Sequence, residues 1–126
     1  MMRFLQSIAT MPLSAEKETI HEADRLHLAR AERILIDTLT TKFMGIEPLG
    51  KLVHMSPSKL KTLFKKEYGK SVFQYYQDKQ MDLALKLLKN TGTSVKGVSI
   101  TLGYDSPSYF TTVFKKYHSF LPSDVL

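Results

Sequence analysis

The sequence predicts an all-α fold in which two helix-turn-helix subdomains are joined by a long linker helix, with about seven helices in all. Three observations lead to this prediction. A segment of the chain is repeated fifty residues later, apolar residues recur at helical spacing through most of the 126 residues, and no stretch alternates polar and apolar residues long enough for a strand. The chain is therefore expected to consist of packed helices.

The repeat relates residues 56–66, SPSKLKTLFKK, to residues 106–116, SPSYFTTVFKK. Seven of the eleven pairs are identical, whereas average residue usage gives roughly one identity by chance. If one extra residue is allowed in the second copy, residues 46–50 also match residues 95–99, and His54 matches Gly103. In both copies a short apolar segment precedes a Ser-Pro start and a longer amphipathic run. This order predicts a helix, a turn and a second helix, twice.

The second helix of each copy has a well-defined start. Ser56 and Ser106 are good N-caps, because a serine hydroxyl accepts from the free N–H groups of the first turn, and a proline follows each of them where a missing N–H costs nothing. Behind these starts, apolar residues at i, i+3 and i+4 form one stripe per helix, made of Leu60, Leu63 and Phe64 in the first copy and of Phe110, Val113 and Phe114 in the second. The polar residues beside each stripe are expected to face solvent.

The segments around the repeat are also expected to be helical. Residues 71–89, which follow the helix terminator Gly69, predict the linker helix, with a buried side of Phe73, Tyr76, Met81, Ala84, Leu87 and Leu88. Residues 25–43 predict a helix that packs on the first unit through Leu28, Ala31, Ile34, Leu35, Thr38 and Leu39. We divide the chain into an N-terminal tail or linker remnant (1–24), a first subdomain (25–70), the linker helix (71–90) and a second subdomain (91–126).

Composition restricts the function classes. The absence of cysteine excludes disulfides and thiolate metal sites, and it favours a reducing compartment. No run of about 18 apolar residues is present, so we expect a soluble cytoplasmic chain without a membrane partner. The four histidines lack ligand spacing, and no Gly-rich phosphate loop, nucleophile elbow or metal motif appears. The sequence therefore predicts no enzyme activity, no metal and no cofactor.

Positive charge is concentrated in the second part of the chain. Residues 1–47 carry six basic and seven acidic side chains, whereas residues 48–126 carry 12 basic and five acidic ones, so that the net charges are −1 and +7. The windows 51–66 and 106–123 contain no Asp or Glu. This distribution suits a polyanion as a partner, although an excess of lysine also serves solubility.

With both units in place, the chain resembles the AraC/XylS family of transcription regulators. The resemblance covers about residues 28–126 and rests on the stretches LVHMSPSKLKTLFKKEYGKSVFQYY, MDLALKLL and VSITLGYDSPSYFTTVFKKYHSFLP. It implies a bilobed domain for sequence-specific binding of double-stranded promoter DNA, with two recognition helices in neighbouring major grooves roughly 34 Å apart. It also implies the output domain of a regulator, such as an activator, whose sensor domain lies outside this chain and for which RNA polymerase is a further candidate partner.

Transferred residue by residue, the resemblance assigns two sets of contacts. The base-facing positions fall on Ser58, Lys61, Thr62, Pro107, Ser108, Thr111 and Thr112. The phosphate-facing positions fall on Ser56, Lys65, Lys66, Ser106, Lys115 and Lys116. Recurrence of a Lys-Lys pair at the same phase of both helices supports the second set.

Several residues depart from the family pattern. Thr62 and Thr112 stand where the family often has Arg, Gln80 where Arg is common in the linker helix, Ser99 where Ala is usual and Ser119 where Gly is typical. Ser and Thr form single hydrogen bonds or methyl contacts, instead of bidentate Arg-guanine pairs worth about 1–3 kcal/mol each. We therefore expect a module that depends strongly on phosphates and DNA shape.

Other interpretations of the same residues stay open. The chain suits a helical protein-interaction module that binds through an apolar groove, or a non-specific architectural nucleic-acid binder. The aromatic residues of the basic region are expected to pack in the core, although stacking on unpaired bases is an alternative. Asp78 and Asp82, four residues apart, are expected on a solvated face with Lys79 and Lys86.

Overall fold

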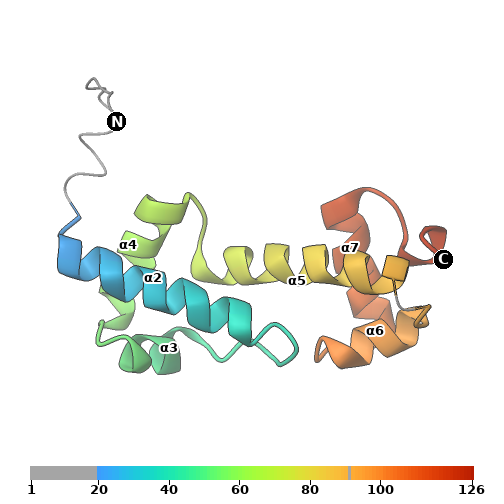
Figure 1. Ribbon diagram of the computed structural model, residues 1–126, viewed down its shortest axis with the longest axis horizontal. Coiled ribbons are helices and arrows are strands. Elements are labelled where there is room, and N and C mark those ends of the chain that lie inside the picture. Colours follow the sequence, from blue (N-terminus) through green and yellow to red (C-terminus); the bar gives the residue numbers. More distant parts are fainter. Residues whose placement is uncertain (1–19, 91) are drawn as a thin grey trace, which may run out of the picture.

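The computed structural model describes residues 20–90 and 92–126, and every regular element within them is helical. In chain order these are α2 (Glu22–Asp37), α3 (Ile46–Leu52), α4 (Pro57–Tyr68), α5 (Val72–Asn90), α6 (Val95–Thr101), α7 (Pro107–His118) and the short 3-10 helix η1 (Pro122–Asp124). Figure 1 shows two lobes joined by α5. The predicted all-α fold is confirmed, and the number of described helices is close to the predicted seven. Most of the predicted N-terminal tail, residues 1–19, lies outside the described residues.

The first lobe packs α2, α3 and α4 around one apolar core. Leu28 and Leu35 from α2, Leu49 from α3, and Leu60 and Phe64 from α4 have no exposed surface. Full burial of a leucine or phenylalanine side chain contributes roughly 1.5–3 kcal/mol. The residues of α2 and α4 lie on the predicted apolar faces, so the apolar pattern of the sequence determines which faces of these two helices turn toward the core.

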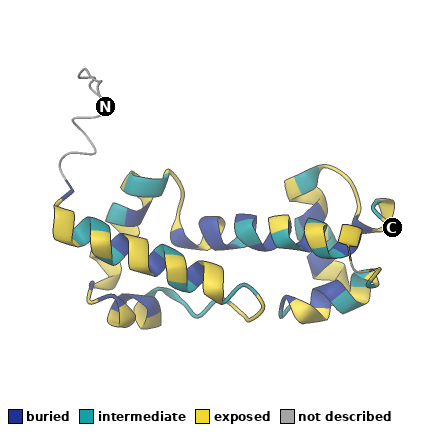
Figure 2. Ribbon diagram, viewed as in Figure 1, coloured by how far each residue is buried: buried dark blue, intermediate teal, exposed yellow. Residues whose placement is uncertain are grey.

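The second lobe repeats this arrangement with fewer helices. Val98 and Leu102 from the α6 unit pack with Phe110 and Phe114 of α7, and all four are buried. Figure 2 shows buried positions on the inner sides of both lobes and exposed positions on their outer sides. The two cores are separate clusters, one in each lobe.

The linker helix α5 supplies residues to both cores. Val72, Tyr75 and Tyr76 belong to the first, and Met81, Ala84 and Leu88 belong to the second. Phe73, predicted on the buried side, is 46% exposed, and its ring meets Phe43 edge-on with the centroids 5.4 Å apart. The prediction for Phe73 was wrong because Val72 takes the core-facing position, and the next residue along a helix points about 100° away from it.

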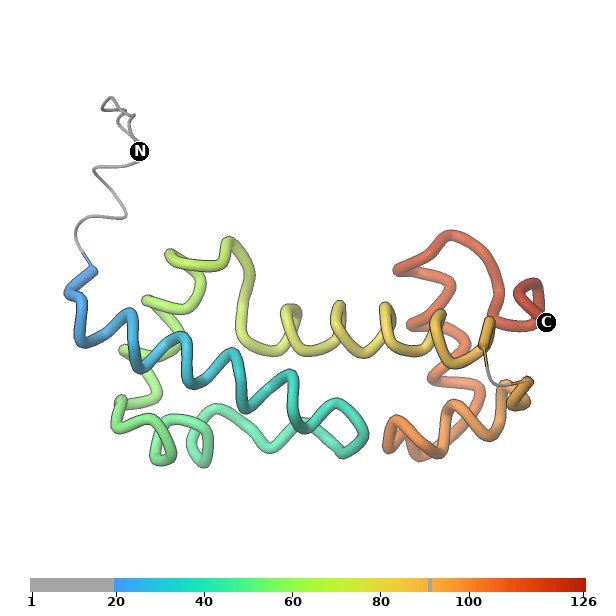
Figure 3. Tube along the Cα trace, in the orientation of Figure 1, coloured from blue at the N-terminus to red at the C-terminus, as the bar shows by residue number. Residues whose placement is uncertain are grey.

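The helix ahead of the first unit is shorter than predicted. It ends at Asp37, whereas the apolar pattern predicted a helix over 25–43, and it begins earlier, at Glu22. Thr38 Oγ1 donates to the carbonyl of Ile34 at 2.8 Å, and Thr41 Oγ1 donates to the carbonyl of Thr38 at 2.9 Å. Such local side-chain bonds compete with continuation of a helix. Residues 38–45 instead form a loop, which the trace in Figure 3 shows reaching toward the end of α6.

Both units turn in the same way between their helices. His54 and Gly103, which the sequence alignment pairs, have φ values of 61° and 81°, in the left-handed region. The backbone bond that closes the turn is also repeated, from the Met55 N–H to the Gly50 carbonyl at 2.9 Å and from the Tyr104 N–H to the Ser99 carbonyl at 3.0 Å. The structure thus confirms two helix-turn-helix units.

The predicted helix starts are confirmed as well. The Ser56 hydroxyl accepts from the backbone N–H of Lys59 at 3.2 Å, and the Ser106 hydroxyl accepts from that of Tyr109 at 3.1 Å. A proline occupies the first turn of each helix. These caps satisfy N–H groups that have no partner within the helix, so α4 and α7 begin at equivalent positions of the repeat.

Candidate nucleic-acid interface

Each unit exposes a polar face on its second helix, α4 in the first unit and α7 in the second. All the side chains predicted to face DNA bases lie there. Thr111 is half-buried and the others are exposed, namely Ser58, Lys61, Thr62, Pro107, Ser108 and Thr112. The two threonines that match in the repeat, Thr62 and Thr112, are therefore both at the surface and neither is enclosed in a core.

The two polar faces lie on the same side of α5. Lys61 and Lys65 of α4 line a hollow of about 290 Å³ whose floor includes Phe73. Thr112 and Lys116 of α7 line another hollow, of about 470 Å³, that also includes Phe73. Because one exposed side chain borders both hollows, the faces of α4 and α7 open toward a common surface. Figure 3 shows that the two helices also run in the same direction, one near each end of α5.

This common surface carries uncompensated positive charge. Five lysines of α4 and α7 are exposed and form no ion pair with any described residue, namely Lys61, Lys65, Lys66, Lys115 and Lys116. Three of them, Lys61, Lys65 and Lys116, line the two hollows. Lys59 differs from them, since its Nζ lies 3.1 Å from Asp24 Oδ1 of α2. A group of lysines without ion-pair partners attracts phosphates. Lys59 does not belong to this group because its charge is compensated by Asp24.

The hydroxyl groups of the surface differ in what they offer a ligand. Thr112 Oγ1 donates its hydrogen to the carbonyl of Ser108 at 3.1 Å. Its oxygen therefore remains as an acceptor, together with the exposed methyl group. No such bond is found for Thr62 among the described residues, so its hydroxyl is free to donate or to accept.

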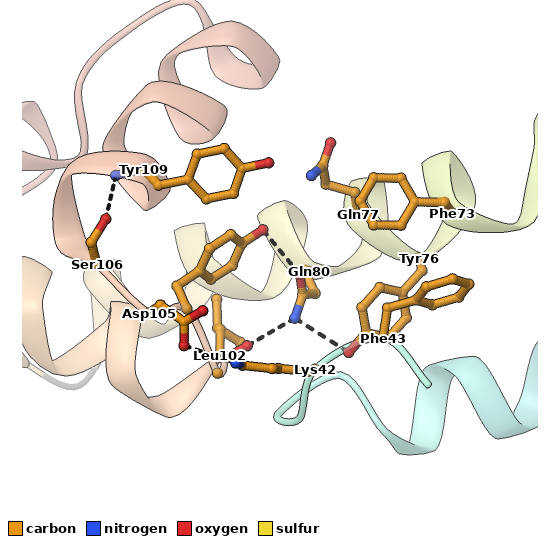
Figure 4. A pocket seen from close by; sticks show the side chains of 12 residues that line it. Lys42, Phe43, Phe73, Tyr76, Gln77, Gln80, Leu102, Asp105, Ser106 and Tyr109 are labelled. Atoms are coloured by element: carbon orange, nitrogen blue, oxygen red, sulfur yellow. Dashed lines mark hydrogen bonds and ion pairs between the residues drawn. The ribbon is translucent and has the colours of Figure 1, made fainter. Parts of the chain in front are cut away.

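A cleft of about 360 Å³ lies between the lobes, over the middle of α5 (Figure 4). The phenol of Tyr109 and the amide of Gln77 point toward each other across it. Tyr109 is 55% exposed and follows directly after the predicted contact Ser108. Sequence reasoning did not assign Tyr109 to the surface, and the available signal was its mismatch with Lys59 in an otherwise well-matched repeat.

The wall of the cleft includes a largely buried tyrosine. The pKa of Tyr104 is raised to about 12, mainly by burial, with a hydrogen bond to Gln77 lowering it and neighbouring Tyr109 adding to the rise. Tyr104 therefore stays protonated at neutral pH, and its hydroxyl is a fixed donor to Gln80 Oε1 at 3.1 Å.

A model of the helix-turn-helix domain family matches residues 49–126. The arabinose operon regulatory protein of Escherichia coli K12 is 28% identical over 120 residues, which span 95% of this chain and 41% of that protein. The chain belongs to the AraC/XylS family of helix-turn-helix transcription regulators. Like its curated relatives it has the family domain, and it spans less than half of the length of the arabinose regulator.

Solved structures share the architecture of this AraC/XylS domain. The C-terminal domain of AraT, a response regulator from Geobacillus stearothermophilus, has a TM-score of 0.74 and 25% identity, over 79% of this chain and 82% of that one. The DNA-binding domain of AdpA, solved in complex with a target DNA, has a TM-score of 0.72 and 23% identity, over 77% and 86% of the two chains. The likeness to the AdpA domain shows a shared fold.

The carboxylates of α5 in this AraC/XylS domain do not form the expected solvated face. Asp78 is buried, and it binds Lys70 and accepts from Gln74 Nε2 at 2.6 Å. Asp82 is exposed, and it accepts from the Tyr117 hydroxyl at 3.1 Å. The expectation was wrong for Asp78 because this carboxylate is bonded to Lys70, in the loop before α5, and to Gln74. Each carboxylate holds a neighbouring segment in place.

The described residues contain no group of three or more His, Asp or Glu side chains arranged to hold a metal ion. Among the described helices of the AraC/XylS domain, none has the length and apolar character needed to cross a bilayer. The polar surface of α4 and α7 is therefore the strongest candidate site within the described residues.

Proposed function

We propose that this domain binds double-stranded DNA by placing α4 and α7 in neighbouring major grooves on one face of the duplex. The observation that carries the proposal is the pair of matching polar faces that open toward one surface. Major grooves on one face of B-DNA recur every helical turn, roughly 34 Å, and an α-helix fits into each. The AdpA domain, which has this fold, is found with a target DNA.

Phosphate contacts come from the unpaired lysines and the helix starts. Lys65, Lys66, Lys115 and Lys116 lie at the ends of α4 and α7, away from the capped N-termini at Ser56 and Ser106. The N-terminus of a helix and a lysine Nζ can each bind a phosphate oxygen, so each recognition helix is held to the DNA backbone at both of its ends.

Base contacts come from side chains in the first half of each helix, namely Ser58, Lys61, Thr62, Pro107, Ser108, Thr111 and Thr112, which are exposed except for the half-buried Thr111. The oxygen of Thr112, whose hydrogen is bonded to Ser108, suits an exocyclic amine of adenine or cytosine, and its methyl suits thymine. Single contacts of this kind discriminate less than bidentate arginine contacts. Affinity therefore depends mainly on phosphates and DNA shape.

We also propose that the domain serves as the output module of a cytoplasmic transcription regulator. Its subdomains at 25–70 and 91–126, joined by the linker helix at 71–90, bind the two halves of a promoter site. A sensor domain and RNA polymerase are the further partners that we propose for it.

The salt dependence of binding tests this function. We expect the affinity for a labelled duplex, measured by fluorescence anisotropy, to fall on the order of a thousandfold between about 50 and 200 mM salt, because each neutralised phosphate releases counterions. A protein-interaction module would not bind the duplex at either salt concentration. An architectural binder would show the same salt dependence but equal affinity for every duplex sequence.

A further inference from the structure

The lobes of this domain meet through polar contacts around one side chain of α5. The helix passes from the first core to the second between Tyr76 and Met81, and Gln80 stands at this crossing. Gln80 is 4% exposed, which is unusual for a side chain that prefers water. A buried amide is retained at little cost only when its polar atoms have partners.

The partners of Gln80 come from both lobes. Its Nε2 donates to the carbonyl of Leu39, in the loop after α2, at 2.8 Å and to the carbonyl of Leu102, at the end of α6, at 3.0 Å. Its Oε1 accepts from the Tyr104 hydroxyl at 3.1 Å. Figure 4 shows this amide between the two lobes, beneath the cleft. One side chain thus holds a backbone group of each lobe.

The backbones of the two lobes are also in close contact beside Gln80. A Cβ on Gly103 would lie 3.1 Å from the carbonyl carbon of Thr41, so only a residue without a side chain leaves this approach unstrained. Lys42 Nζ lies 2.8 Å from Asp105 Oδ1 across the same junction. Asp105 is the extra residue by which the second turn exceeds the first, and here it meets the first lobe.

We propose that Gln80 is a positioning residue that fixes the distance between α4 and α7 and thereby selects the spacing of the two DNA half-sites. This inference rests on the proposed function. The cores of the lobes are separate, so without the Gln80 contact the restraints described at the junction are α5, the backbone approach of Gly103 to Thr41 and the Lys42–Asp105 ion pair. If the lobes are already held at the distance that matches the two half-sites, binding does not carry the entropic cost of ordering one lobe relative to the other.

The first test measures the lobes without DNA. The chain has no cysteine, so Leu26→Cys on α2 and Ile100→Cys on α6, at positions that are 63% and 62% exposed, give one spin label on each lobe. We expect a narrow distance distribution by pulsed electron paramagnetic resonance, and a broad one in Gln80→Met, which keeps the volume but removes both donors. Gln74→Met, the same substitution six residues earlier on α5, is expected to leave the distribution narrow.

The second test compares half-sites. We expect Gln80→Met to lower the affinity of the domain for a duplex with both half-sites by about tenfold. The variant should bind a duplex whose spacer is one base pair longer nearly as well as it binds the original duplex. Its affinity for a single half-site should equal that of the unsubstituted chain. Tyr104→Phe, which removes the bond to Gln80 Oε1 alone, is a milder variant expected to show a smaller effect in the same direction.

Two results would overturn the inference. One is an unchanged distance distribution in Gln80→Met, and the other is an equal loss on single and paired half-sites, which would make Gln80 a residue for stability alone. If the unsubstituted chain binds no duplex, the proposed function itself fails. The distance measurement still shows in that case whether Gln80 sets the arrangement of the lobes.

Discussion

Ser119 ends α7 in the same left-handed conformation in which Gly69 ends α4, with φ values of 72° and 79°. In both cases the residue donates its backbone N–H to the carbonyl four residues earlier, Lys115 or Lys65, at 2.8 Å. The repeat therefore extends to the helix ends, and in the second unit a residue with a side chain adopts a conformation that favours glycine.

We predict that Ser119→Gly stabilises the protein by about 1 kcal/mol, because a left-handed conformation costs a residue with a Cβ roughly 1–2 kcal/mol. Ser119 is exposed, so no packing is lost. Urea denaturation followed by circular dichroism measures the change. Gly69→Ala is the matched control, and it should destabilise by a similar amount. If Ser119→Gly leaves the midpoint unchanged, strain at this helix end is not the explanation.

Ser99 offers a second stabilising change. Its hydroxyl is fully buried and has no hydrogen-bond partner among the described residues. A buried polar group without a partner costs about 1–3 kcal/mol, so Ser99→Ala is expected to raise the free energy of unfolding by at least about 1 kcal/mol.

The equivalent position of the first unit supplies the control. A Cβ on Gly50 would lie 2.5 Å from the Met55 carbonyl oxygen, which is backbone and cannot turn aside. Gly50→Ala is therefore expected to destabilise the domain, by about 1–3 kcal/mol. A loss of stability in Ser99→Ala would show that its hydroxyl has a partner after all.

Stability is also expected to fall at alkaline pH. Burial raises the pKa of Tyr104 to about 12 and raises that of Tyr76, while unfolded tyrosines ionise near 10. The unfolded chain then loses protons between pH 10 and 12 while the native chain keeps them, so this contribution is complete below pH 10 and is lost as the pH rises through that interval. Urea denaturation at a series of pH values, with Tyr104→Phe showing a shallower fall, measures it. If the free energy of unfolding falls equally steeply with pH in Tyr104→Phe and in the unsubstituted chain, Tyr104 does not contribute to the alkaline loss of stability.

The lysines of α4 and α7 should act through phosphates. We predict that Lys65→Ala and Lys115→Ala each lower affinity for all duplex sequences alike, and that each reduces the slope of log affinity against log salt by about 0.9. Anisotropy titrations over a salt series measure this slope. Lys86→Ala, an exposed lysine of α5 outside the polar faces, is the control and should keep the slope. A change of sequence preference in Lys65→Ala would instead assign that side chain to a base.

The sequence reveals the two units because their signals are local. The caps Ser56 and Ser106, and the apolar stripes behind them, depend on neighbours within one or two helical turns. The same rules predicted a helix over 25–43, which is too long at its C-terminal end. They contain no information on the hydrogen bonds from Thr38 and Thr41 to the preceding backbone, or on the Tyr76 hydroxyl, which donates to the Thr38 carbonyl at 2.9 Å.

The contacts between the lobes were not predictable in this way. Gln80 bonds to residues 41 and 22 positions away, on opposite sides of it in sequence. In the sequence it is a lone polar residue on a mostly apolar helix face, and its departure from the family pattern was the only signal. The exposed side of Phe73 was missed for a related reason, since periodicity does not tell where a helix leaves one core and enters another.

Selection of bound duplexes from a random pool tests the central claim most directly. If α4 and α7 occupy neighbouring major grooves, the enriched sequences should contain two blocks of preferred bases whose centres lie about 10–10.5 base pairs apart, with weak preference at each position. A single block, or enrichment of none, would contradict binding by two recognition helices.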